Sequence, residues 1–109
     1  NFIEKMNLIP HKYPILDVHI NISYTGINGE IDFIINDKLI EMKVSKINIL
    51  NSLYLCQILS YNHMIKNRNY NINNLIIFNP LLGTIIDIEN NQNTINISNN
   101  IFNEFIKYK

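Results

Sequence analysis

The chain has 109 residues, of which 47% are hydrophobic and 17% charged, and its formal net charge is zero. This length supports one domain with a single modest core, and the composition is typical of a globular protein and not of a disordered one. Zero net charge excludes a global field that attracts nucleic acid, so any such affinity must come from a local patch or from an attached domain.

Cysteine content and hydropathy indicate the cellular compartment in which the chain is expected. The single cysteine, Cys56, excludes an intramolecular disulfide and a cysteine-based zinc site. The longest apolar runs are too short to cross a bilayer, and no signal peptide is visible. We therefore expect an intracellular protein without a membrane partner, in the cytoplasm or nucleus, or at a viral replication site if the chain is viral. The chain begins with Asn instead of Met, which is compatible with a fragment of a larger protein.

The first predicted elements are a short helical segment and a strand. Apolar residues within residues 1–14 fit one or two helical turns that end at Pro10. From Ile15 to Tyr24, apolar and polar residues alternate, which predicts a strand. The glycines and Asn of Thr25–Gly29 predict a turn into the next strand.

Residues 29–46 carry the clearest pattern in the chain. Glu30–Ile35 and Leu39–Val44 both alternate polar and apolar residues at period two, the spacing of half-buried strands. Between them lie Asn36 and Asp37, which tolerate positive φ and favour a tight connection. The segment therefore predicts a β-hairpin.

If the strands pair antiparallel around this turn, residues whose numbers sum to 73 lie opposite each other. Asp32 then faces Glu41 and Glu30 faces Lys43, so three carboxylates and one amine share a face. The other face is predicted to pack against a helix and collects Ile31, Phe33, Ile35, Ile40, Met42 and Val44. Like charges directly opposite destabilise a sheet, whereas a hard cation such as Mg²⁺ between the two acids would reverse that effect. The alternative is an ordinary surface strand in which Lys43 offsets an acid.

A helix is predicted after the hairpin, over residues 52–66, because apolar residues recur there every three or four positions. Gln57 and Tyr61 lie four residues apart and share a stripe with Tyr54, one turn earlier. His63 lies away from this stripe and is expected to face solvent.

The remaining chain predicts two strands, a further short strand and a helix. Leu75–Phe78 is a continuous apolar run, typical of a strand buried on both faces, and the preceding helix predicts a right-handed crossover with parallel pairing. Asn79–Gly83 predicts a turn and Thr84–Glu89 an adjoining strand. Residues 94–97 fit a short last strand, and residues 99–109 a terminal helix.

The order and spacing of these motifs resemble the PD-(D/E)XK nuclease superfamily. Asp32 is followed, after eight residues, by Glu41-Met42-Lys43, and the next helix carries Gln57-x-x-x-Tyr61, which is similar to the RecB-like branch. The resemblance covers roughly residues 29–89. It implies one α/β domain over residues 1–109, with a restriction-endonuclease-like mixed sheet flanked by helices and an αβββαβ core whose first helix is short or missing.

The resemblance also implies a chemistry: a Mg²⁺- or Mn²⁺-dependent nuclease that hydrolyses DNA phosphodiester bonds in replication, repair or recombination. A fused or associated helicase, or another replication protein, would be its partner. Asp32 and Glu41 would hold one or two ions with the main-chain carbonyl of Met42, and Lys43 would position or deprotonate the attacking water. Gln57 would orient the scissile strand.

Several alternatives stay open. The resemblance implies that Tyr61 contacts the phosphate, but an aromatic side chain packing on the sheet is the alternative. The family's upstream His or Glu ligand has no clear counterpart, and His19 is either that ligand or a plain surface residue. The whole chain could instead be a catalytically inactive nuclease-fold module that binds nucleic acid or a protein partner, or an α/β interaction module unrelated to nucleases.

Overall fold

The structure is a computed structural model that describes residues 16–24, 26–46 and 52–107. The helical turns expected within residues 1–14 lie outside the described residues. The elements, in chain order, are β1 (Leu16–Tyr24), β2 (Ile27–Ile35), β3 (Lys38–Met42), α2 (Ser52–Met64), the 3₁₀ turn η1 (Ile65–Asn67), β4 (Asn74–Asn79), β5 (Thr84–Glu89) and α3 (Gln92–Lys107).

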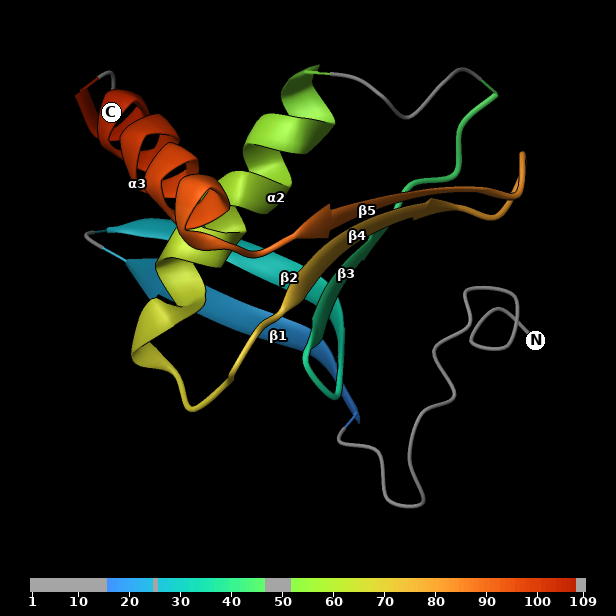
Figure 1. Ribbon diagram of the computed structural model, residues 1–109, viewed down its shortest axis with the longest axis horizontal. Helices are drawn as coiled ribbons and strands as arrows, with labels where there is room; N and C mark the ends of the chain where they lie inside the picture. The colour runs from blue at the N-terminus through green and yellow to red at the C-terminus, as the bar shows by residue number, and fades with distance from the viewer. Residues whose placement is uncertain (1–15, 25, 47–51, 108–109) are drawn as a thin grey trace.

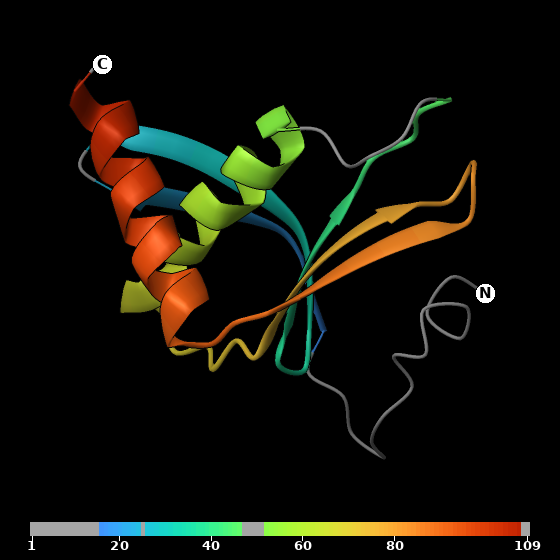
Figure 2. The same ribbon diagram turned by 45° about the horizontal axis from the view of Figure 1, so that its top comes forward.

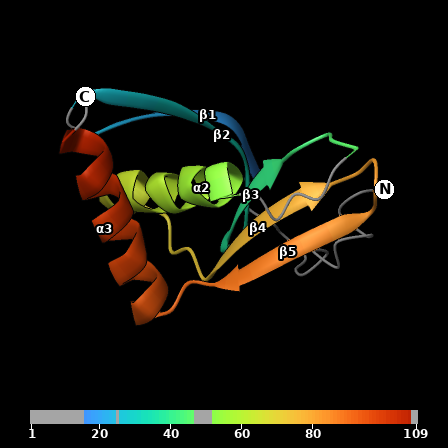
Figure 3. The same ribbon diagram turned by 90° about the horizontal axis from the view of Figure 1, so that it is seen from above.

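The described strands form one five-stranded sheet in the order β1-β2-β3-β4-β5 (Figure 1). All neighbours are antiparallel except β3 and β4, which are parallel and joined through α2, as the sequence predicted. The sheet is strongly curved, and α2 lies on its concave side (Figure 3). Helix α3 lies beside α2 (Figure 2). This confirms an α/β fold with a mixed sheet and helices, whereas the restriction-endonuclease-like arrangement stays a prediction.

The hairpin of β2 and β3 forms around the predicted turn. Asn36 takes a left-handed conformation with a φ of 55°, which Asn tolerates better than most residues. The paired residues are Phe33 with Ile40, Ile34 with Leu39 and Ile35 with Lys38, so their numbers sum to 73. The predicted register is therefore confirmed for these pairs.

The prediction for the helix-covered face of this hairpin was wrong. Ile34 and Leu39 belong to the main core together with Ile58 and Met64 of α2, so the helix covers the face that also carries Asp32 and Glu41. The apolar side chains on the other face form a second, smaller cluster made of Phe33, Ile35, Ile40, Met42, Ile76 and Phe78. The period-two pattern separates the two faces, but it does not tell which face the helix takes.

The alternation of side chains between the two faces of the sheet also breaks within β2. Ile31 and Ile34 lie three residues apart, yet both are fully buried in the main core, so Ile31 was assigned to the wrong face. The change of phase falls near Asp32. The β1–β2 pairing skips His19 and Asp32 between the pairs Val18–Phe33 and Ile20–Ile31. His19 has a φ of 50°, which departs from extended backbone.

Helix α3 begins earlier than predicted and includes residues 94–97, which were expected to form a strand. Asn91 caps the helix because its Oδ1 accepts a hydrogen bond from the amide of Thr94 at 3.0 Å. The hydroxyl of Thr94 donates to the carbonyl of Glu89 at 2.7 Å. Ile95 and Ile97 are exposed, so these β-branched residues were not a sign of a buried strand.

His63 was expected to face solvent and is instead 6% exposed. Its ring stacks on Phe102 of α3 with 4.4 Å between centroids, and its Nδ1 lies 2.6 Å from Oδ1 of Asn99. Burial lowers its pKa below the usual value, so the ring is neutral near pH 7. The sequence could not reveal this contact because it depends on how α2 and α3 pack against each other. Among the described helices, none is both long and apolar enough to span a membrane.

Candidate active site

Asp32 and Glu41 converge where β2 and β3 separate. Their strands pair as far as Phe33 and Ile40, and beyond that point side-chain bonds replace the ladder. The amide of Met42 donates to Oδ2 of Asp32 at 2.9 Å, and Oε1 of Glu41 lies 3.4 Å from the amide of Asp32. The two acids therefore lie on neighbouring strands, on the side of the sheet that α2 covers.

Burial perturbs the ionisation of Glu41. Glu41 is only 3% exposed, and burial, followed by the negative charge of Asp32, raises the pKa of its carboxyl group to about 8. The charge of Lys43 lowers this pKa, but its effect is smaller than those of burial and Asp32. Without a cation, Glu41 is protonated at neutral pH; a cation bound between the acids would favour the ionised form.

Lys43 follows directly after β3, and its amine lies close enough to Glu41 to affect the charge of that carboxyl group. Its amide donates to the carbonyl of Phe78 at 2.9 Å, which continues the alignment with β4. Its Nζ lies 5.2 Å from the centroid of the Tyr54 ring on α2, within the range of a cation–π contact. The helix therefore helps to orient the amine near Glu41.

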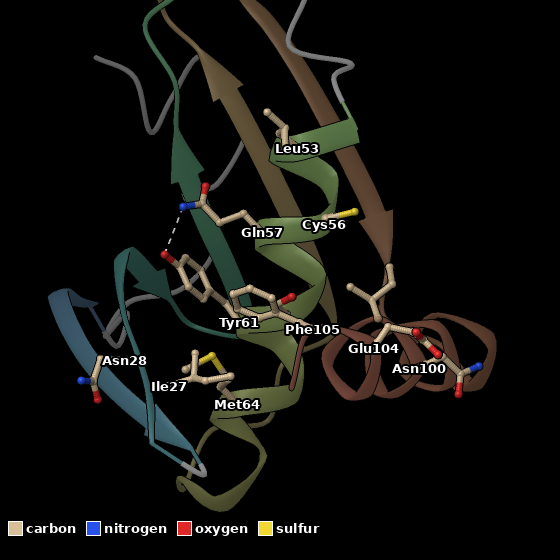
Figure 4. A pocket seen from close by; sticks show the side chains of 12 residues that line it. Ile27, Asn28, Leu53, Cys56, Gln57, Tyr61, Met64, Asn100, Glu104 and Phe105 are labelled. Atoms are coloured by element: carbon tan, nitrogen blue, oxygen red, sulfur yellow. Dashed lines mark hydrogen bonds between the residues drawn. The ribbon is translucent and has the colours of Figure 1, made fainter. Parts of the chain in front are cut away.

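Gln57 and Tyr61 reach from α2 toward the hairpin, on the side of the helix opposite Cys56 (Figure 4). Nε2 of Gln57 donates to the hydroxyl of Tyr61 at 3.1 Å. Burial and then the charge of Glu41 raise the pKa of Tyr61, which indicates that the phenol is near the acid pair. Tyr61 also packs on the sheet, so the two interpretations of this side chain are compatible.

Gly29 makes the close approach of Tyr61 possible. A Cβ at this position would lie 2.5 Å from Cε1 of the tyrosine ring, far inside van der Waals contact. Gly29 was predicted to belong to a turn, but it lies within β2, which begins at Ile27. Its absence of a side chain therefore serves packing and not a turn.

Two further candidate site residues, Glu30 and His19, bond to each other. Glu30 was expected to face Lys43, but its Oε1 lies 2.7 Å from Nδ1 of His19, and both side chains are exposed. The described residues contain no group of three or more His, Cys, Asp or Glu placed to hold a metal ion. Met42 contacts Asp32 through its amide, and the role of its carbonyl as a third ligand stays a prediction.

Asn79 is a residue of this region whose importance sequence reasoning missed. It is fully buried at the end of β4, and its Nδ2 donates to the carbonyl of Ser45 at 2.7 Å. Its Oδ1 accepts from the amides of Leu81 at 3.1 Å and Ser45 at 3.4 Å. Asn79 thus holds the segment that follows Lys43, whereas its place before a proline had predicted only a turn.

No protein-family model, curated protein or solved structure matches this chain. The geometry of the acid pair, the lysine and the Gln57–Tyr61 stripe is therefore the basis for the function proposed below.

Proposed function

We propose that the chain is a divalent-metal-dependent nuclease domain that hydrolyses DNA phosphodiester bonds. The observation that carries this proposal is the convergence of Asp32 with the almost fully buried Glu41, beside Lys43. Two adjacent acids, one of them almost fully buried, destabilise the fold when both are ionised, and a bound cation offsets that repulsion. Carboxylate oxygens are also the donors that Mg²⁺ and Mn²⁺ prefer.

Each side chain then has a role consistent with its position. Asp32 and Glu41 would hold the cation with the carbonyl of Met42, and the ion would supply Lewis acidity and a more acidic bound water. Lys43 would position that water and stabilise charge that develops on the phosphate. Gln57 and Tyr61 would orient the scissile strand through hydrogen bonds.

Delivery of the substrate would depend on more than this chain. The formal net charge of zero supplies no long-range attraction for DNA. A fused or associated helicase, or another replication, repair or recombination protein, would bring the strand to the site.

A catalytically inactive nuclease-fold module that binds nucleic acid or a protein is the second candidate. It is favoured by the main-chain amides that already engage both acids, those of Met42 and Asp32. These bonds satisfy carboxyl oxygens without a metal ion, as a purely structural acid pair would require.

A cleavage assay separates the two candidates. Single- and double-stranded DNA would be incubated with Mg²⁺, Mn²⁺ or a chelator, using the wild type, Asp32→Ala and Lys43→Ala. The matched controls are Asp87→Ala, an exposed acid on β5, and Lys38→Ala, at the opposite end of β3. We expect metal-dependent cleavage that both site variants lower by about 100-fold or more, the range typical of lost acid–base catalysis, while both controls retain it. Equal activity in all five proteins, or activity in the chelator, would refute the proposal.

A further inference from the structure

A groove of about 720 Å³ lies between α2, α3 and the start of β2 (Figure 4). Its walls are mainly apolar and include Leu53 and Met64 of α2, Ile27 of β2 and Phe105 of α3. Leu53 and Phe105 are 75% and 54% exposed, so this apolar surface is open to solvent. A groove of this size is large enough for a planar ring system.

The charges of the groove disfavour a phosphate inside it. Among the described residues of its lining, Glu104 is the one that carries a charge, and Lys107 offsets this carboxylate with an ion pair of 2.8 Å. The lining also includes two residues with amide side chains, Gln57 and Asn100. Amides can both donate to and accept from the edge of a base, so the lining suits a neutral, flat, hydrogen-bonding group.

The groove shares a wall with the proposed active site. Gln57 and Tyr61 line it, and both side chains reach toward the hairpin that carries Asp32 and Glu41 (Figure 4). A chain whose phosphodiester lies at the acid pair would therefore carry its neighbouring nucleotide along this wall.

We propose that this groove binds an unstacked nucleobase of single-stranded nucleic acid, next to the phosphodiester held at the acid pair. Phe105 supplies an aromatic face for stacking, and the amides contact the edge of the base. A duplex presents its bases only after unpairing, so the groove selects single strands. This inference depends on the proposed function for the position of the phosphate, but base binding itself needs no hydrolysis.

The test measures binding without catalysis. Fluorescence anisotropy would compare a labelled thymidine oligonucleotide with an abasic oligonucleotide of equal length and charge, in a chelator, so that no divalent cation and no hydrolysis contribute. The groove variants are Phe105→Ala and Leu53→Ala. Ile97→Ala is the matched control, since Ile97 is an exposed apolar residue of α3 outside the groove lining.

We expect the wild type and Ile97→Ala to bind the thymidine oligonucleotide about 5- to 150-fold more tightly than the abasic one, the range of stacking for one base. Both groove variants should lose most of this preference while melting like the control. Absent binding, equal binding of the two oligonucleotides, or an undiminished preference in the groove variants would overturn the inference. So would groove variants that alter self-association in sedimentation and leave oligonucleotide binding unchanged, because the groove would then be a protein interface.

The outcome is distinct from that of the cleavage assay. Base preference without cleavage would keep the groove as a binding site and remove the nuclease proposal. Metal-dependent cleavage without base preference would support the nuclease proposal and refute the groove as a base-binding site.

Discussion

The amide of Met42 donates a hydrogen bond to Oδ2 of Asp32 at 2.9 Å, so the acid on β2 holds the end of β3. Asp32 therefore stabilises the hairpin in addition to its proposed role toward a metal ion. The same contact places the main chain that follows Glu41 against the acid pair.

Asn and Ala at position 32 should separate these two roles. Asp32→Asn retains an oxygen acceptor for Met42, whereas Asp32→Ala leaves this amide without one, so we expect the Ala variant to be less stable by about 1 kcal/mol. Both should lose cleavage. Urea unfolding in a chelator at pH 5, where Glu41 is protonated, gives the comparison, and equal stability of the two variants would argue against the structural bond.

Glu41 should make stability fall as pH rises. Its folded pKa of about 8 exceeds the ordinary value of 4.5, so the folded state binds the proton more tightly than the unfolded state. The free energy of unfolding of the wild type should decrease between about pH 4.5 and pH 8 by up to a few kcal/mol. Glu41→Gln should remove most of this decrease, whereas Glu89→Gln, on an exposed strand position, should not. If the free energies of unfolding of the wild type and Glu41→Gln change in parallel with pH, the raised pKa of Glu41 would be contradicted.

Gly29→Ala should destabilise the fold because its Cβ would overlap the ring of Tyr61. Overpacking of this kind costs about 1–3 kcal/mol, and a displaced tyrosine should also weaken cleavage. In Tyr61→Ala the clash is absent, so adding Gly29→Ala there should cost much less. Thermal unfolding of the two single variants and the double variant measures this coupling, and simple additivity would argue against the contact.

Tyr54 should act as a positioning residue for Lys43. Tyr54→Phe keeps an aromatic face under Nζ, whereas Tyr54→Leu removes it, and a cation–π contact at a partly exposed site contributes about 0.5–1 kcal/mol. We therefore expect cleavage to fall severalfold in the Leu variant and to be retained in the Phe variant, with a changed pH profile only in the former. Equal kinetics and pH profiles in the two variants would remove this role.

Local patterns predicted much of the sheet. The Asn36-Asp37 turn set the register of β2 and β3, and the apolar run of Leu75–Phe78 marked the buried, parallel β4. These features depend on turn chemistry and periodicity, which a short window of sequence contains.

What failed depended on contacts between distant segments. The face that α2 covers, the burial of His63 against Phe102 and the contact of Gly29 with Tyr61 all join elements separated along the chain. The predicted strand at residues 94–97 failed because the cap at Asn91 outweighed β-branched propensity. In the candidate site, Glu30 was predicted to face Lys43 and instead pairs with His19, because the β2–β3 ladder ends at Phe33 and Ile40 before it reaches them.

The central claim is that the carboxylates of residues 32 and 41 bind one divalent cation. Crystals of the wild type and of Asp32→Asn, grown at pH 8.5 or above with Mn²⁺, would be examined by anomalous diffraction at the manganese edge. We expect a peak within coordination distance of both carboxylates in the wild type and none there in the variant. A manganese-saturated crystal with peaks only elsewhere, or the same peak in both proteins, would contradict the claim.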